Sequence, residues 1–205
     1  MRHLHYSLFA VTLATLVLLI SIYRITALKY HFSSPNDSAS GQAVFASGVE
    51  YSLPYPGILP NNPIWPFKAF RDRLDLFFTF DPLEKAQRTL FLADKRLSAA
   101  QRLFVEGDSG RAVVTATKAE QYLELALIKG RDADVKGTDA AGFFETLFKA
   151  SLTHRQMLEE MMSRAPEDGK PILNKTLDSP KKVNEQVSHF LNERGKTLLT
   201  PTPTN

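Results

Sequence analysis

His154 is the one ionisable side chain that lies in a predicted apolar helix stripe, where a histidine can bind a metal ion or titrate near neutral pH. Its nearest ligand-type neighbours, Glu159 and Glu160, follow five and six residues later and so fall outside its helix face. A metal site needs several converging ligands, and no such spacing links the other histidines, which are His3, His5, His31 and His189. The sequence therefore favours a packing role for His154 and leaves metal or small-molecule sensing as the alternative.

Two aromatic side chains are further candidates for binding. Trp65, the only tryptophan, lies in LPYPGILPNNPIWPFK, residues 53–68, together with five prolines. Three of these prolines recur every third residue from 60 to 66, which fits a polyproline ligand for an aromatic groove. The interleaved apolar residues fit a rigid brace packed on a helical body, and we favour the brace, which predicts a buried Trp65. Tyr122 lies on an alanine-rich face, where we expect core packing and not ligand stacking.

Composition and charge exclude several classes of protein. The chain has no cysteine, which excludes disulfides, thiol catalysis and zinc held by cysteine. It has 25 Lys and Arg against 22 Asp and Glu, and three of the basic residues (Arg2, Arg24 and Lys29) precede the first acidic one, Asp37. The remaining charges balance, so we expect no nucleic-acid partner. No nucleophile is paired with a base, which predicts a protein that is not an enzyme and needs no cofactor.

The elements that position these residues begin after an apolar N-terminal segment, LFAVTLATLVLLISIY, residues 8–23. Sixteen uncharged residues at about 1.5 Å each fall short of a hydrocarbon core of roughly 30 Å. The stretch from Tyr6 to Leu28 is long enough if Arg24 extends to the interface. We therefore predict a membrane anchor that contacts the bilayer through residues 7–28.

A cleaved signal peptide is the competing interpretation of this segment, although a cut after Ala27 would place the large Ile25 three positions before the cut. The flanking charges nearly balance, so they do not fix the orientation. The chain divides into an anchor or uncleaved signal (1–30), a flexible linker (31–50), a helical body (51–194) and a disordered tail (195–205).

The first long helix of the body has a clear start. Asp81 is the predicted N-cap, Pro82 the first helical residue and Glu84 the third, which suits the positive end of the helix dipole. The helix is expected to end at Gly107. Its apolar residues recur at alternating spacings of three and four, the seam of a helix packed lengthwise on another: Leu83, Ala86, Leu90, Ala93, Leu97, Ala100 and Phe104.

Further helices follow with short connections. An antiparallel return from Ala112 is expected to end at Gly130, and a third helix with a stripe from Phe144 to Met161 is closed by Pro166. A last helical stretch, about 167–194, is expected to break or kink at Pro180. The fold class is therefore all-α, an antiparallel bundle of long helices preceded by one N-terminal transmembrane helix.

Two expectations concern the surface of this bundle. A short helix capped by Asn62 and starting at Pro63 should bury an apolar stripe made of Phe67, Phe70, Leu74 and Phe77. The scattered acidic residues resemble those of solvated helix faces, among them Glu84, Glu106, Glu120, Glu124 and Glu145.

Two runs of this sequence resemble an uncharacterised bacterial domain of unknown function. They are YPGILPNNPIWPFKAFRDRLDLFFTFDPLEKAQRTLFLADKRLSAAQ and THRQMLEEMMSRAPEDGKPILNKTL, and the likeness extends from about Tyr51 to Phe190. An added proline near residue 54 and the sequence Asp178–Ser179–Pro180 depart from the family's pattern. The family occurs outside the membrane in anchored proteins and beside anti-sigma-like segments.

The resemblance implies a helical fold and an extracytoplasmic location, and it supplies no activity. Combined with the anchor, it predicts a single-pass membrane protein whose C-terminal body acts by contacts with envelope proteins. The alternative is an extracytoplasmic sensor that binds a metal or small molecule in the bundle near His154.

Overall fold

The computed structural model describes residues 51–194, which fall within one compact unit of the chain. The predicted anchor, linker and tail lie outside the described residues. Within the described part of the chain, no helix combines the length and the apolarity needed to cross a membrane.

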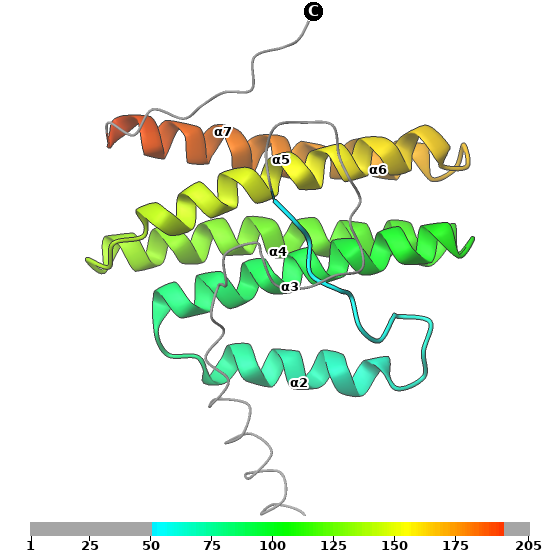
Figure 1. Cartoon of the computed structure of the whole chain (residues 1–205), viewed down its shortest axis with the longest axis horizontal. Helices are drawn as coiled ribbons and strands as arrows, with labels where there is room; N and C mark the ends of the chain where they lie inside the picture. The colour runs from blue at the N-terminus through cyan, green and yellow to red at the C-terminus, as the bar shows by residue number, and fades with distance from the viewer. Residues whose placement is uncertain (1–50, 195–205) are drawn as a thin grey trace, which may run out of the picture. The chain divides into compact units, whose positions relative to one another are not determined.

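The described residues are all-helical, as the sequence predicts, and the successive long helices α2 to α5 run antiparallel, whereas α6 and α7 follow each other in the same direction (Figure 1). In Figure 1, α2 forms an outer layer against α3, and α7 lies on the other side beyond α4 and α5. The helices are α2 (Trp65–Phe78), α3 (Pro82–Val105), α4 (Ser109–Val135), α5 (Ala141–Arg164), α6 (Lys170–Thr176) and α7 (Asp178–Glu193).

The predicted start and end of α3 are confirmed. The Asp81 carboxylate accepts a hydrogen bond of 2.6 Å from the Glu84 N–H, and Pro82 is the first helical residue. At the other end Gly107 adopts a φ of 85°, which L side chains rarely adopt. The chain then turns, and Asp108 caps α4 by accepting from the Arg111 N–H at 3.2 Å.

The prediction that the second long helix ends at Gly130 is wrong, since α4 continues to Val135. Gly130 is buried, and a Cβ atom there would lie 2.4 Å from Phe143 Cε1 of α5. The glycine thus allows α4 and α5 to approach closely. The left-handed glycine that follows this helix is Gly137, with a φ of 87°.

The last helical stretch breaks three residues before the predicted position. The prediction placed the break at Pro180, whereas the junction of α6 and α7 lies at Leu177. Pro180 is buried in the first turn of α7, where a missing N–H removes no intrahelical hydrogen bond. The proline therefore starts the second helix and does not interrupt one.

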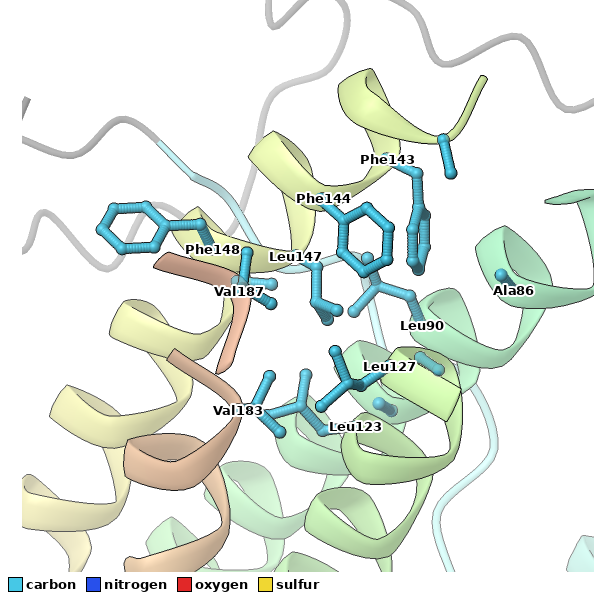
Figure 2. Close-up of a cluster of buried hydrophobic side chains, with 14 of the residues drawn as sticks. Ala86, Leu90, Leu123, Leu127, Phe143, Phe144, Leu147, Phe148, Val183 and Val187 are labelled. Atoms are coloured by element: carbon cyan, nitrogen blue, oxygen red, sulfur yellow. The ribbon is translucent and has the colours of Figure 1, made fainter. Parts of the chain in front are cut away.

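Two clusters of buried side chains form the core. Figure 2 shows the first, in which Phe143, Phe144 and Leu147 of α5 meet residues of α3, α4 and α7. The second cluster combines the other ends of α3, α4 and α5 with Leu173 of α6 and Leu177. Small residues of α3 and α4 let these two helices pack closely over their whole length: Ala86, Ala93, Ala100, Ala112, Ala116, Ala119 and Ala126.

The segment before α2 packs on both clusters. Tyr51 lies against the first cluster, and Leu53 and Leu59 lie against the second. This segment is the cyan trace that leads to the start of α2 in Figure 1. Lys68 of α2 holds it by donating to the carbonyl oxygens of Pro56 at 2.9 Å and Ile58 at 3.2 Å.

Candidate functional site

His154 lies in the centre of the bundle and is completely buried. Its Nδ1 is 2.8 Å from Glu120 Oε1 of α4, and its Nε2 is 3.0 Å from Asp94 Oδ1 of α3. Both carboxylates are themselves buried. One side chain of α5 is thereby joined to the two neighbouring helices through both of its ring nitrogens.

A fourth side chain closes this cluster from the N-terminal side. The Tyr51 hydroxyl donates to Asp94 Oδ2 at 2.6 Å, so both oxygens of Asp94 are engaged. Glu120 differs, because its Oε2 atom is buried and has no hydrogen-bond partner among the described residues. We refer to Tyr51, Asp94, Glu120 and His154 as the buried tetrad.

The electrostatics of the tetrad favour a charged histidine. Burial by itself lowers the pKa of His154, but the negative charges of Glu120 and Asp94 and the hydrogen bonds to both carboxylates outweigh it and raise the pKa from 6.5 to about 10. Burial, and then the negative charge of Asp94, raise the pKa of Tyr51 well above 10. At neutral pH the tetrad therefore holds an imidazolium ion between two carboxylates, with a neutral phenol.

This arrangement determines which chemistry the tetrad can perform. The two carboxylates lie on opposite sides of the imidazole and do not converge on a common point, and no group of His, Asp and Glu in residues 51–194 could hold a metal ion. A protonated imidazole whose two N–H groups are both hydrogen-bonded has no lone pair with which to bind a ligand or accept a proton, and its burial keeps substrates away from it. The tetrad can fix the rotation of α3, α4 and α5 relative to one another and attach Tyr51 to them. This geometry does not favour the alternative in which a metal or small molecule binds near His154.

The expectation that the acidic residues lie on solvated helix faces is wrong at Glu120, which is buried. The predicted candidate residues do not include Asp94. A signal was nevertheless present, because Asp94 follows Leu90 by four residues and Glu120 follows Ala116 by four. Residues four apart on an α-helix lie on the same face, so each carboxylate shares the core-facing side of its helix with a buried apolar residue.

The other two candidate residues lie outside the tetrad. Trp65 is half-buried and lines a cavity of about 20 Å³ between α2 and α3, enough for about one water molecule. Lys95 and Arg96 lie in the same wall. The ring of Tyr122 packs against the first cluster, and the Arg96 guanidinium carbon lies 3.9 Å from its centroid.

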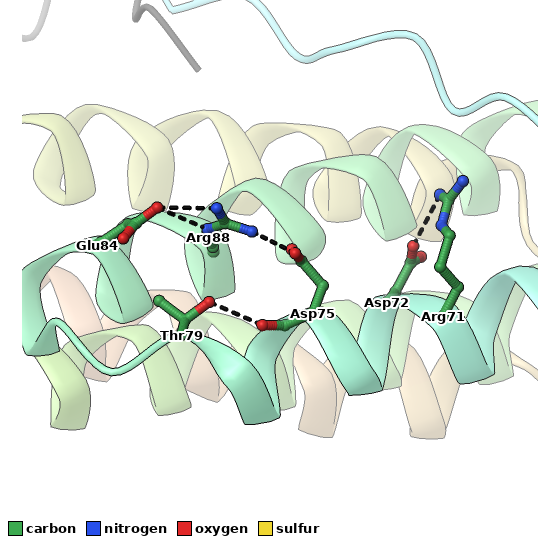
Figure 3. A network of polar contacts seen from close by, with 6 residues as sticks. All are labelled: Arg71, Asp72, Asp75, Thr79, Glu84 and Arg88. Atoms are coloured by element: carbon green, nitrogen blue, oxygen red, sulfur yellow. Dashed lines mark hydrogen bonds and ion pairs between the residues drawn. The ribbon is translucent and has the colours of Figure 1, made fainter. Parts of the chain in front are cut away.

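An ion pair links α2 to α3. Figure 3 shows Arg88 of α3 between Asp75 of α2 and Glu84 of its own helix, with the Glu84 contact at 2.8 Å. The Thr79 hydroxyl donates to the Asp75 carbonyl oxygen at 2.7 Å. Burial lowers the pKa of Lys68 and of Lys95, which lie at this boundary.

The outer surface of α2 contradicts the predicted burial of its apolar stripe. Phe67, Phe70 and Phe77 are 76%, 60% and 71% exposed, and α2 has no buried residue. The helix also starts at Trp65, later than predicted, because the Asn62 side chain accepts from the Ile64 N–H at 2.9 Å in a turn that precedes the helix. We call Ile64, Phe67, Phe70, Leu74, Phe77 and Phe78 the aromatic face.

Comparison with known proteins identifies a family. The model of a family described as a domain of unknown function (DUF5667) matches residues 57–194. No curated protein and no solved structure matches the chain.

Proposed function

We propose, from the premise that this chain belongs to the DUF5667 family of domains of unknown function, that it is a non-catalytic module anchored in a membrane. In this proposal its helical body lies outside the cytoplasm of a bacterial cell and acts by contacts with other envelope proteins. The apolar segment 8–23 supports the anchor, and the resemblance to extracytoplasmic domains supports the location.

The observation that carries the non-catalytic role is the closure of the buried tetrad. His154 has no exposed surface, and each of its ring nitrogens is bonded to a carboxylate. The side chains most capable of acid–base or ligand chemistry in the described bundle thus bond to one another. The described bundle is therefore expected to interact with other molecules through its surface, as in protein–protein contacts.

Labelling in intact cells tests the location, because the natural chain has no cysteine to interfere. Ile172 is 51% exposed on α6, so an Ile172→Cys variant carries one accessible thiol. A membrane-impermeant maleimide should label it in intact cells. Labelling only after lysis would place the body in the cytoplasm and refute the proposed location. Retention of the protein in the membrane pellet after alkaline carbonate extraction tests the anchor separately.

Chemical crosslinking in the same cells, followed by mass spectrometry, tests the protein contacts. We expect crosslinks from surface lysines of the body to another envelope protein, and the same links should be lost when the body is unfolded before crosslinking. Recovery of intramolecular links alone would contradict a role in protein contacts.

A further inference from the structure

The aromatic face is an apolar surface on a helix that already has a partner. At about 100° per residue, Trp65, Ala69 and Leu76 lie on one side of α2, and the aromatic face is centred on the opposite side. Trp65 and Ala69 line the cavity against α3, so the aromatic face points away from the bundle. The bundle therefore leaves this face open.

The exposed area is large for a monomer. Taking about 200 Å² for a full phenylalanine side chain, the four phenylalanines of the aromatic face (67, 70, 77 and 78) present roughly 500 Å². That is within the range of the largest apolar patches on ordinary monomers, and such patches are often functional.

The charges beside the aromatic face are positive. Arg71 lies within the face and Arg73 lies at its edge, and both are exposed. The acidic residues of α2 are turned the other way, since Asp75 pairs with Arg88 of α3 and Asp72 has only 14% of its side chain exposed. Arg71 donates to Asp72 at 3.0 Å. An occupant of this face should combine apolar groups with negative charge.

A second copy of the chain fits this face poorly. In an antiparallel pair of α2 helices the two Arg71 side chains would face each other, as would the two Arg73 side chains, with no carboxylate on this face to pair with them. The available area is also below the roughly 800 Å² per partner that a stable protein interface buries.

We propose that the aromatic face of α2 lies in the interface of an anionic lipid bilayer, with its phenylalanines among the upper acyl chains and Arg71 and Arg73 at the phosphate groups. Phenylalanine on one face with arginine beside it is the composition of helices that lie in the plane of a membrane. The negative surface supplies the charge that the face lacks.

The proposal rests on the proposed membrane anchor in one respect: the anchor keeps the helical body close to the bilayer. The 27 residues from Arg24 to Glu50 cannot span more than roughly 100 Å, so an anchored body stays near the bilayer. Weak insertion by a helix of 14 residues is then sufficient, because the anchor holds the face close to the lipid.

Spin labels on the full chain test this proposal. Phe70→Cys and Phe77→Cys each place one nitroxide on the aromatic face, and Ile172→Cys places one on an exposed site of α6 as the matched control. The chain is reconstituted into vesicles of phosphatidylcholine mixed with phosphatidylglycerol. Collision with oxygen, which concentrates in lipid, is compared with collision with a water-soluble nickel chelate. Circular dichroism confirms that each variant is folded.

We expect labels at positions 70 and 77 to collide more with oxygen than with nickel, and the label at 172 to show the reverse. Strong nickel collision at all three positions would place the face in water and overturn the proposal. Weak collision with both reagents at 70 and 77 would indicate burial against protein and also overturn it. Flotation of the protein with the vesicles tests the membrane anchor independently. A chain that floats with the vesicles but has a water-exposed aromatic face would therefore refute the lipid contact and not the anchor.

Charge reversal gives a second readout. The variant Arg71→Glu with Arg73→Glu should reduce the inserted fraction in anionic vesicles by about fivefold or more, and should matter little in vesicles of phosphatidylcholine alone. The matched control is Arg102→Glu, an exposed arginine of α3 outside the face. An equal loss in both lipids, or none, would show that anionic headgroups do not hold the face.

Discussion

The charged state of His154 predicts that the protein loses stability as the pH rises from neutral. The pKa of His154 is raised from 6.5 to about 10 in the folded state. Folding therefore favours the protonated form, and the resulting stabilisation is fully present below about pH 6.5 and disappears as the pH passes through about 10. At 1.36 kcal/mol for each pKa unit, the full contribution is on the order of 4 to 5 kcal/mol.

Between about pH 7 and pH 9, linkage removes about 2 to 3 kcal/mol from the free energy of unfolding. For a body of this size the melting temperature should fall by roughly 10 °C. Thermal or urea unfolding at a series of pH values measures this slope. Burial lowers the pKa of Lys68 and Lys95, which raises stability with pH and partly offsets the fall.

The decisive comparison is with a variant in which position 154 and its two carboxylate partners cannot titrate. His154→Leu combined with Asp94→Asn and Glu120→Gln removes the buried charges together, which avoids leaving either carboxylate without its counter-ion. Its stability should change less between the two pH values than that of the natural protein. Nitrogen NMR of the natural protein adds a test that needs no variant, with the exposed His189 as reference. A neutral imidazole at His154 at about pH 8, or equal slopes in both proteins, would refute the reasoning.

Three further substitutions test the packing. Gly130→Ala should destabilise the body by about 1 to 3 kcal/mol, because its Cβ would lie 2.4 Å from a ring carbon of Phe143. Tyr51→Phe should cost about 1 to 3 kcal/mol, since it leaves Asp94 Oδ2 buried without its donor. Trp65→Ala should cost about 1 to 2 kcal/mol, less than for a fully buried tryptophan, because Trp65 is half-buried. Urea unfolding at neutral pH measures all three.

Matched controls accompany these substitutions. Gly142→Ala places a Cβ where nothing lies within 4 Å, and it should leave stability unchanged or raise it slightly. If Gly130→Ala behaved in the same way, the close approach of α4 and α5 would be wrong. A Tyr51→Phe protein as stable as the natural one would show that the hydroxyl does not hold Asp94. A Trp65→Ala loss of 3 kcal/mol or more would mean that α2 packs more tightly on α3 than its exposure indicates.

Both ends of α3 could be predicted because local chemistry sets them. Asp81 and Pro82 begin α3 with a side-chain cap and a preset φ, and Gly107 ends it in a left-handed conformation, so no distant contact is needed. Gly130 shows the limit of such rules. A glycine reads locally as a helix end, whereas here the approach of Phe143 from another helix requires it.

The buried tetrad could not be predicted because it depends on how three helices are rotated. Asp94 and Glu120 are not part of the rows of apolar residues that mark the core face of α3 and α4, but they lie beside those rows and are buried with them. Only the docking of α5 brings His154 between them. For α2 the difficulty was a choice between two faces, since Trp65, Ala69 and Leu76 form a second, smaller apolar face. The ion pair from Asp75 to Arg88 helps to hold that face against α3.

The attachment of residues 51–60 has a mechanical consequence. Any tension applied from the N-terminal side enters the body at Tyr51, whose hydroxyl is bonded to α3 in the core. Beyond that bond the load meets Leu53 and Leu59 on the second cluster and the two carbonyl groups held by Lys68. Because these contacts follow one another along the segment, a pull must release Tyr51 first and then break the contacts with the second cluster and with Lys68 before it reaches the start of α2 along the backbone.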